Sequence, residues 1–140
     1  MLSGMPVCEI KIEPQSNKFQ AYPHQKAAWN AMDRHFIGEA KKKAGMMVVP
    51  TGGGKTTIAA RWLLKNYVDQ KGRVLWLSHR RSLLEQAFDT FAHASHLAST
   101  KARLAMMAIS SQDKNWSNVE AGHDVVFSMV QSAATKSLSQ

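Results

Sequence analysis

VVPTGGGKTT, residues 48–57, is the stretch of sequence that decides the fold. It overlaps a short apolar run, MMVVP (46–50), which predicts a strand, and it leads into TTIAARWLLKNYV (56–68), which predicts a helix. The glycines at 52–54 can adopt positive φ angles without a Cβ clash, so their N–H groups can turn inward around an anion. A strand, a glycine-rich loop and a helix in this order predict a phosphate-binding loop.

The residues after the glycines supply the charge and the hydroxyl that a nucleoside triphosphate needs. A helix N-terminus favours negative charge through its unpaired N–H groups and its dipole. Lys55 is expected to reach the β- and γ-phosphates, and Thr56 to offer its hydroxyl to Mg²⁺, so both are predicted catalytic residues. A glycine turn that merely joins a strand to a helix is the alternative. The loop residues expected to contact the nucleotide are Pro50, Thr51, Gly52, Gly53, Gly54, Lys55, Thr56 and Thr57.

The composition narrows the class of protein and the kind of partner. The 140-residue chain has 18 Lys and Arg against 10 Asp and Glu, a net charge of +8, which favours a polyanionic partner. This length suits one domain with a real core, and the composition excludes disordered, collagen-like and disulfide-stapled chains. The single cysteine, Cys8, favours a reducing compartment, so the cytoplasm is the expected location. No apolar run reaches the roughly 18–20 residues of a membrane span, so no membrane partner is expected.

Outside the loop, short apolar strands alternate with amphipathic helices. Residues 1–20 are polar with little pattern and are interpreted as an extended lead-in to a domain over 21–140. The alternation predicts an α/β fold with a parallel sheet that helices cover on both faces. The further predicted elements are a helix from His24 to Lys43, a strand over 73–78, a helix from Arg80 to about Leu97, a strand over 103–110, a loop over 113–123 and a strand over 124–129.

On these motifs the sequence resembles the first motor lobe of a superfamily-two, DEAD/DEAH-like helicase, and most of all the group of type III restriction subunits and UvrB-like N-terminal domains. The general phosphate-loop pattern has a glycine where this chain has Val49. In that group the first glycine is often replaced, and a proline and a threonine precede the others, as in PTGGGKT (50–56). The resemblance runs from about residue 19 to the end. It implies an incomplete RecA-like P-loop NTPase fold with a three-layer architecture around a parallel sheet. It also implies that the cofactors are ATP and Mg²⁺.

YPHQKAAW, residues 22–29, resembles the glutamine motif of the same family. The resemblance implies that Gln25 contacts the adenine edge, because a carboxamide offers both a donor and an acceptor. Tyr22 or Phe19 is a candidate for stacking on the base. The alternative is a surface glutamine early in a helix.

Two further segments, 74–91 and 124–133, resemble strand-end motifs that contact the nucleic-acid backbone in the family. Hydroxyls, arginines and helix N-terminal amides are the usual partners of phosphate, and ligands gather where parallel strands end. For Arg80 and its neighbour Arg81 the alternative is a solvated helix start. The predicted nucleic-acid contacts are Ser78, His79, Arg80, Ser128, Gln131 and Ser132.

The carboxylates that ATP hydrolysis needs are missing from the expected place. The family supplies them as an Asp-Glu pair at the end of an apolar strand, and none of the five aspartates here is followed by glutamate. Asp124 precedes an apolar strand, so we do not assign it to Mg²⁺. The chain resembles the opening part of one motor lobe, so a fragment is the simplest explanation, and a separate polypeptide is a candidate source of the rest of the motor.

The resemblance therefore implies the ATP-binding and DNA-binding N-terminal portion of a DNA-dependent ATPase, a helicase or translocase. Almost no ATP turnover is expected from this polypeptide alone. Two alternatives remain open. One is a truncated module that binds nucleotide or DNA without turnover, and the other is a P-loop enzyme that is not a nucleic-acid motor, such as a kinase, which would show no salt-dependent affinity for DNA.

Overall fold

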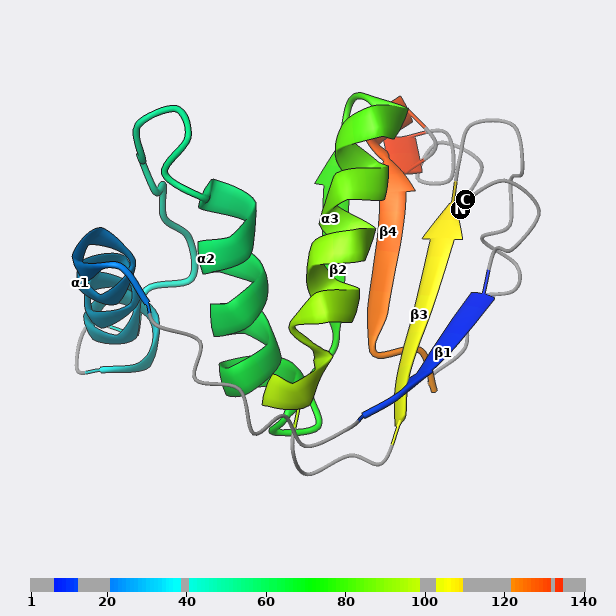
Figure 1. The fold of residues 1–140 in the computed structure, drawn as a ribbon, viewed down its shortest axis with the longest axis horizontal. Coiled ribbons are helices and arrows are strands. Elements are labelled where there is room, and N and C mark those ends of the chain that lie inside the picture. Colours follow the sequence, from blue (N-terminus) through cyan, green and yellow to red (C-terminus); the bar gives the residue numbers. More distant parts are fainter. Residues whose placement is uncertain are drawn as a thin grey trace.

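The computed structural model describes residues 7–12, 21–38, 41–98, 103–109, 122–131 and 133–134. Four strands form one sheet, and three α-helices pack beside it (Figure 1). Two π-helical turns, Asp33–Ile37 and Leu64–Val68, extend the first two helices, and a 3-10 turn, Ser95–Leu97, follows the third. The main elements in chain order are β1 (Val7–Lys11), α1 (Pro23–Met32), α2 (Lys55–Leu63), β2 (Val74–Ser78), α3 (Arg81–His93), β3 (Arg103–Ile109) and β4 (Val125–Met129).

The sheet is α/β in type and is built mainly from parallel strands. Its strand order is β1-β3-β4-β2, in which β2, β4 and β3 are parallel and β1 is antiparallel to β3. The register pairs Leu77 with Ser128 and Ser78 with Met129, so β2 and β4 end side by side. The strands predicted over 73–78, 103–110 and 124–129 are confirmed, and the small open sheet with its helices is an incomplete RecA-like fold.

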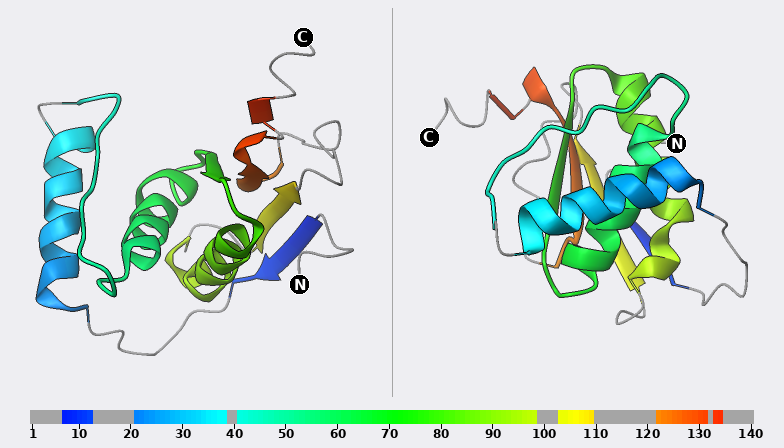
Figure 2. Two further views of the ribbon diagram at one scale, coloured as in Figure 1. Left: turned by 90° about the horizontal axis from the view of Figure 1, so that it is seen from above. Right: turned by 90° about the vertical axis from the view of Figure 1, so that its left-hand side faces the viewer.

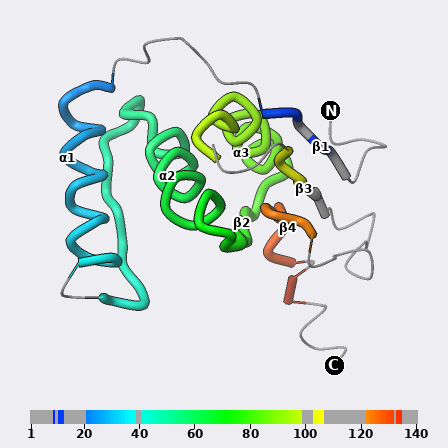
Figure 3. The backbone as a smooth tube through the Cα atoms, turned by 90° about the horizontal axis from the view of Figure 1, so that it is seen from below, coloured from blue at the N-terminus to red at the C-terminus, as the bar shows by residue number. Residues whose placement is uncertain are grey.

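The helices α1, α2 and α3 all lie on one side of the sheet (Figures 2 and 3). α3 lies against the strands, α2 lies beside α3, and α1 forms an outer layer against α2. Helical cover of both faces was predicted, but none of α1, α2 and α3 covers the opposite face. Leu75 and Leu77 point to that face and are 54% and 47% exposed.

The apolar core lies between the sheet and the helices α2 and α3. The phenylalanines Phe91 of α3 and Phe127 of β4 are fully buried, and their ring centroids are 5.3 Å apart. Trp76 of β2 lies edge-on to Phe91 at 5.4 Å. Ile58 and Leu64 are also fully buried, which fixes α2 and places the loop that precedes it.

The lead-in over 1–20 is more than a connection, because residues 7–11 form the edge strand β1. The alternation of Cys8, Ile10 and Ile12 with Glu9 and Lys11 is the period-two pattern of a strand, which was not predicted here. Glu9 accepts a hydrogen bond from Arg103 of β3 at 3.1 Å, and Ile12 packs against the core. The segment therefore contributes to the sheet.

The strand predicted over 46–50 is wrong. These residues pair with none of the described strands and run beside α1, away from the sheet (Figure 1). Met46 is 91% exposed and Val48 86% exposed. An apolar run becomes a strand only where a neighbouring strand satisfies its N–H and C=O groups, and this run lies out of reach of the sheet.

The first helix is also shorter than predicted. It ends with its π-helical turn at Ile37, because Gly38 is extended, with φ −66° and ψ −161°. The lysines at 41–43 lie outside the helix, and Lys41 has a positive φ of 40°. The basic run is therefore part of the connection that leads to the phosphate loop.

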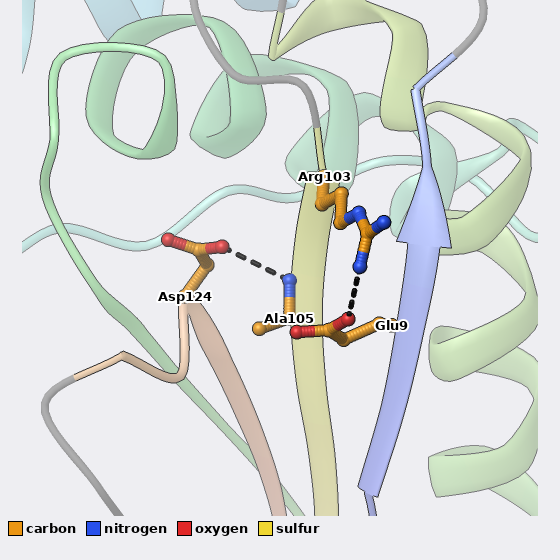
Figure 4. A network of polar contacts seen from close by, with 4 residues as sticks. All are labelled: Glu9, Arg103, Ala105 and Asp124. Carbon is orange, nitrogen blue, oxygen red and sulfur yellow. Dashed lines mark hydrogen bonds and ion pairs between the residues drawn. The ribbon is translucent and has the colours of Figure 1, made fainter.

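Asp124 ties the amino ends of the parallel strands together (Figure 4). Its carboxylate accepts a hydrogen bond from the N–H of Ala105 in β3 at 3.0 Å, and its backbone carbonyl accepts one from Val74 of β2 at 2.9 Å. The residue is 8% exposed, and it lies at the opposite end of β4 from Ser128. Asp124 therefore precedes its strand, as the sequence indicates.

We expect Asp124→Ala to lower the free energy of unfolding by about 1–3 kcal/mol, because the buried N–H of Ala105 loses its acceptor. Asp124→Asn keeps an acceptor oxygen and should cost less. Urea denaturation followed by circular dichroism measures both variants. An alanine variant as stable as the wild type would contradict a structural role for this carboxylate.

Candidate nucleotide-binding site and nucleic-acid edge

The glycine loop has the backbone conformation that the sequence predicts. Gly52 and Gly54 have positive φ angles of 80° and 77°, which residues with a Cβ rarely adopt. The N–H of Gly53 donates to the carbonyl of Pro50 at 2.9 Å, which closes a tight turn over 50–53. Of the three glycine amides expected in the cradle, the one at Gly53 is therefore engaged inside the loop.

The N-terminus of α2 is open. Gly54 is its N-cap and has no side chain to cap the helix, and the first described bond into the helix is from Ile58 N–H to the Gly54 carbonyl at 2.9 Å. Across the described residues, no acceptor is found for the backbone N–H groups of residues 54–57. Unpaired amides at the start of a nine-residue helix form an anion-binding site.

Lys55 and Thr56 are the first two residues of α2. Lys55 is exposed, and Thr56 and Thr57 are half-buried. A lysine here adds a positive charge to that of the helix dipole. In the described part of the chain the Thr56 hydroxyl has no hydrogen-bond partner, so its oxygen remains available to a cation. One hydroxyl fits a Mg²⁺ ion that takes its other ligands from phosphates and water.

Helix α1 runs alongside α2 with a constant sequence offset. Its hydrogen bonds join Trp29 Nε1 to the Ile58 carbonyl at 3.0 Å and Trp62 Nε1 to Asp33 Oδ1 at 2.7 Å, and both pairs are 29 residues apart. A constant offset means that the two helices advance in the same direction, so both N-termini lie at the loop. The Arg61 guanidinium lies 5.6 Å from the centre of the Trp29 ring, and burial lowers the pKa of Arg61.

The start of α1 touches the loop directly. Gln25 is 5% exposed, and its Oε1 accepts a hydrogen bond from the Tyr22 N–H at 3.1 Å. Its Nε2 lies 3.2 Å from where a Cβ on Gly54 would be. The structure thus brings Gln25 beside the loop, while its contact with a base stays a prediction. Tyr22 is 65% exposed, and Phe19, the other candidate for stacking, lies outside the described residues.

Two contacts in the loop were not predicted. His24 Nε2 lies 2.9 Å from the Gly53 carbonyl oxygen. Val49, which replaces the first glycine of the general pattern, fills the space beside Gly53, where an added Cβ would be 2.4 Å from Val49 Cγ1. The sequence held no signal for either contact, because each depends on how α1 and residues 46–50 fold against the loop.

A groove of about 410 Å³ leads from the loop along α1. One wall is helix α1 and its π-helical turn, and the other is the chain from Gly45 to Pro50. His35 Nε2 lies 2.7 Å from the Ala44 carbonyl oxygen and joins the two walls at the far end. The residues that form the groove are His24, Ala28, Ala31, Met32, His35, Phe36, Gly45, Met46, Met47, Val48, Val49 and Pro50.

The predicted nucleic-acid contacts gather where β2 and β4 end. Ser78 is 8% exposed, and its hydroxyl donates to the carbonyl of Arg80 at 3.2 Å and faces the Arg80 N–H at 3.4 Å. This hydroxyl fixes the turn from β2 into α3. His79 and Arg80 are exposed on that turn. Arg81 instead pairs with Glu85 at 3.3 Å, and within the described residues Arg80 has no ion-pair partner.

The predicted contact residue at the end of β4 is less exposed than those at the end of β2. Ser128 is fully buried, and its hydroxyl donates to the Met129 carbonyl at 3.0 Å. Gln131 is exposed just beyond β4. Ser132 lies outside the described residues. The parallel register brings both strand ends to one edge, and Figure 1 shows that the start of α2 lies toward the same end of the molecule.

Comparison of the sequence with models of protein families shows which family the chain belongs to. The model of the family described as "Type III restriction enzyme, res subunit" matches residues 18–140. The chain belongs to this family. Comparison with curated proteins and with solved structures gives no match. The res-subunit family has a helicase-like ATPase domain, which agrees with the glycine loop at the N-terminus of α2.

The family assignment covers the whole predicted lobe, including the glutamine motif and both strand-end segments. Among the described residues no helix is long and apolar enough to cross a membrane. The same residues contain no group of three His, Cys, Asp or Glu side chains that could hold a metal ion.

Proposed function

We propose that the chain binds ATP with Mg²⁺ at residues 50–57 and nucleic acid at the carboxyl edge of the sheet, as the N-terminal portion of a DNA-dependent helicase or translocase. The single observation that carries the proposal is the open N-terminus of α2. Two glycines with positive φ precede it, unpaired amides line it, and Lys55 and Thr56 follow at its first turn. These features suit a triphosphate better than any other common ligand.

In this proposal each residue has a separate task. The amides of residues 54–57 hold the phosphate oxygens, and Lys55 adds a charge that neutralises the terminal phosphates. Thr56 holds Mg²⁺, which when bound neutralises phosphate charge. Gln25 lies beside Gly54, close enough to the loop for a role in positioning the base.

The nucleic-acid part of the proposal rests on charge and on the family. The net charge is +8, and His79 and Arg80 are exposed at the edge where β2 ends. A guanidinium without an ion-pair partner at the N-terminus of a helix is suited to phosphate. DNA is preferred to RNA because the family is described as a restriction enzyme subunit.

Titration of the chain with a fluorescent ATP analogue in the presence of Mg²⁺ tests the nucleotide part. Saturable binding that unlabelled ATP displaces would support the proposal. Binding that adenosine displaces as well as ATP does would contradict it, because the loop recognises phosphate.

A second candidate function is a module that binds nucleotide or DNA without turnover. The observation behind it is that none of the five aspartates in residues 1–140 is followed by glutamate, the pair that would supply a second carboxylate for Mg²⁺ and a base for water. A steady-state ATPase assay with and without single-stranded DNA separates the two functions. Turnover stimulated by DNA favours the motor, and binding without turnover favours the module.

We expect Arg80→Gln to weaken binding of single-stranded DNA and to lower the slope of log affinity against log salt by about 0.7, because one phosphate contact is lost. Arg81→Gln is the matched control, since Arg81 already pairs with Glu85. Fluorescence anisotropy of labelled DNA at several salt concentrations measures the slopes. Equal slopes in wild type and Arg80→Gln would contradict a phosphate contact by Arg80.

A further inference from the structure

We propose that His24 is a positioning residue for the phosphate loop, whose imidazole N–H holds the peptide between Gly53 and Gly54 with the Gly54 amide facing the anion. This inference rests on the proposed function of the loop. The residue lies 29 positions from Gly53 in sequence and belongs to another helix, so it can act on the phosphates only through the loop backbone.

The geometry of one peptide bond carries the argument. His24 Nε2 lies 2.9 Å from the Gly53 carbonyl oxygen, which can only accept, so the proton is on Nε2. The described backbone has no cis peptide, and in a trans peptide the C=O and the following N–H point in opposite directions. Holding the carbonyl toward α1 therefore turns the Gly54 N–H away from α1, toward the open end of α2.

The backbone alone does not fix this orientation. Glycine adopts either sign of φ at little cost, so a peptide flanked by two glycines can rotate easily. Gly54 has φ 77°, and its N–H has no acceptor among the described residues. The hydrogen bond from His24 is the described contact that selects one orientation of the carbonyl.

His24 is itself held in place by its helix. Pro23 begins α1, and the bonds from Trp29 to the Ile58 carbonyl and from Trp62 to Asp33 fix α1 on α2. The Tyr22 ring lies nearly parallel to the His24 ring, at 5.8 Å and 11°. The donor thus sits on a rigid element that starts beside the loop.

The chain contains a matched contact that serves as a control. His35 Nε2 lies 2.7 Å from the Ala44 carbonyl oxygen, at the far end of the groove. Both histidines join α1 or its π-helical turn to the same connection through a carbonyl oxygen. Of these two contacts, only that of His24 involves a residue of the phosphate loop. Removing the ring donor of each histidine in turn therefore separates positioning of the loop from general support of the connection between α1 and α2.

The test compares two ligands, Mg²⁺-ATP and inorganic triphosphate, which lacks the base. His24→Phe keeps a ring but loses the donor, and we expect it to weaken both ligands by the same factor, roughly 3- to 10-fold. His24→Gln replaces the donor N–H at a similar reach and should restore both affinities. His35→Phe should leave both affinities unchanged, and thermal unfolding checks that each variant folds.

Each other outcome overturns the inference. Unchanged affinities in His24→Phe would mean that the loop does not need the hydrogen bond. If His24→Phe lost affinity for ATP but not for triphosphate, His24 would act on the base and not on the phosphates. If His24→Gln lost as much affinity as His24→Phe, the ring would act through packing and not through its hydrogen bond. A wild-type chain that binds neither ligand would overturn the proposed function itself, and the inference with it.

Discussion

Lys55→Ala is expected to weaken the binding of Mg²⁺-ATP roughly 10- to 100-fold, because a hydrogen bond between charged groups contributes about 1.5–3 kcal/mol. The side chain is exposed at the first position of α2, so its removal leaves no cavity in the core. The free energy of unfolding should therefore change little. Equilibrium titration with a fluorescent ATP analogue, together with urea denaturation, measures the two effects separately.

Lys65→Ala is the control for this change. Lys65 is an exposed lysine in the π-helical turn that extends the same helix, so it lies far from the loop. Its replacement removes the same charge and should leave ATP affinity near the wild-type value. If Lys55→Ala and Lys65→Ala behave alike in a folded sample, the phosphate loop is not the nucleotide site, and the assignment of ATP binding is wrong.

Gly53→Ala is expected to reduce ATP affinity about as much as Lys55→Ala does, because the added side chain changes the shape of the loop. An added Cβ would lie 2.4 Å from Val49 Cγ1 and 2.9 Å from the Pro50 carbonyl oxygen. Those distances are too short, and the second atom is backbone, so the turn over 50–53 has to open. Backbone distortion of about 1–3 kcal/mol corresponds to roughly 5- to 150-fold in affinity.

Gly122→Ala provides the matched control. Gly122 is exposed just before β4, and an added Cβ there would meet no atom within 4 Å. This variant should bind ATP as the wild type does. Equilibrium titration with a fluorescent ATP analogue compares the two variants. A label on the nucleotide that absorbs in the visible or near-infrared range keeps protein absorbance out of the fluorescence signal. Wild-type affinity in Gly53→Ala would show that the turn tolerates a side chain and that its described shape is not required.

The elements that sequence reasoning predicted well are those with a local cause. TTIAARWLLKNYV forms α2 and its π-helical turn because its apolar residues recur at helical spacing and bury Ile58, Leu64 and Val68. Gly52 and Gly54 adopt the positive φ angles that a glycine-rich loop before a helix needs. The residues of β2 and β4 are apolar runs bounded by turns, and they pair in parallel, the strand direction that was predicted for the sheet.

The predictions that were wrong concern mainly segments whose structure depends on pairing with residues far away in the sequence. MMVVP has the composition of a strand, yet it pairs with nothing in the sheet, because hydrogen bonding to a neighbour and not apolar character makes a strand. The strand β1 was overlooked although its alternation is visible, because a single short strand is recognised by its pairing with β3. Gly38 ended the first helix earlier than the basic run suggested.

The sequence by itself determined the family, the glycine-rich loop before α2 and the elements from α2 to β4, because these follow from residue types at fixed spacing along one segment. Only the tertiary structure decided which groups around the loop are engaged. It set His24 on the Gly53 carbonyl and Gln25 beside Gly54, and among the described residues it paired Arg81 with Glu85 while Arg80 has no ion-pair partner. The contacts of His24 and Gln25 join residues far apart in the chain, so they are fixed by how α1 packs on α2, which no local pattern encodes.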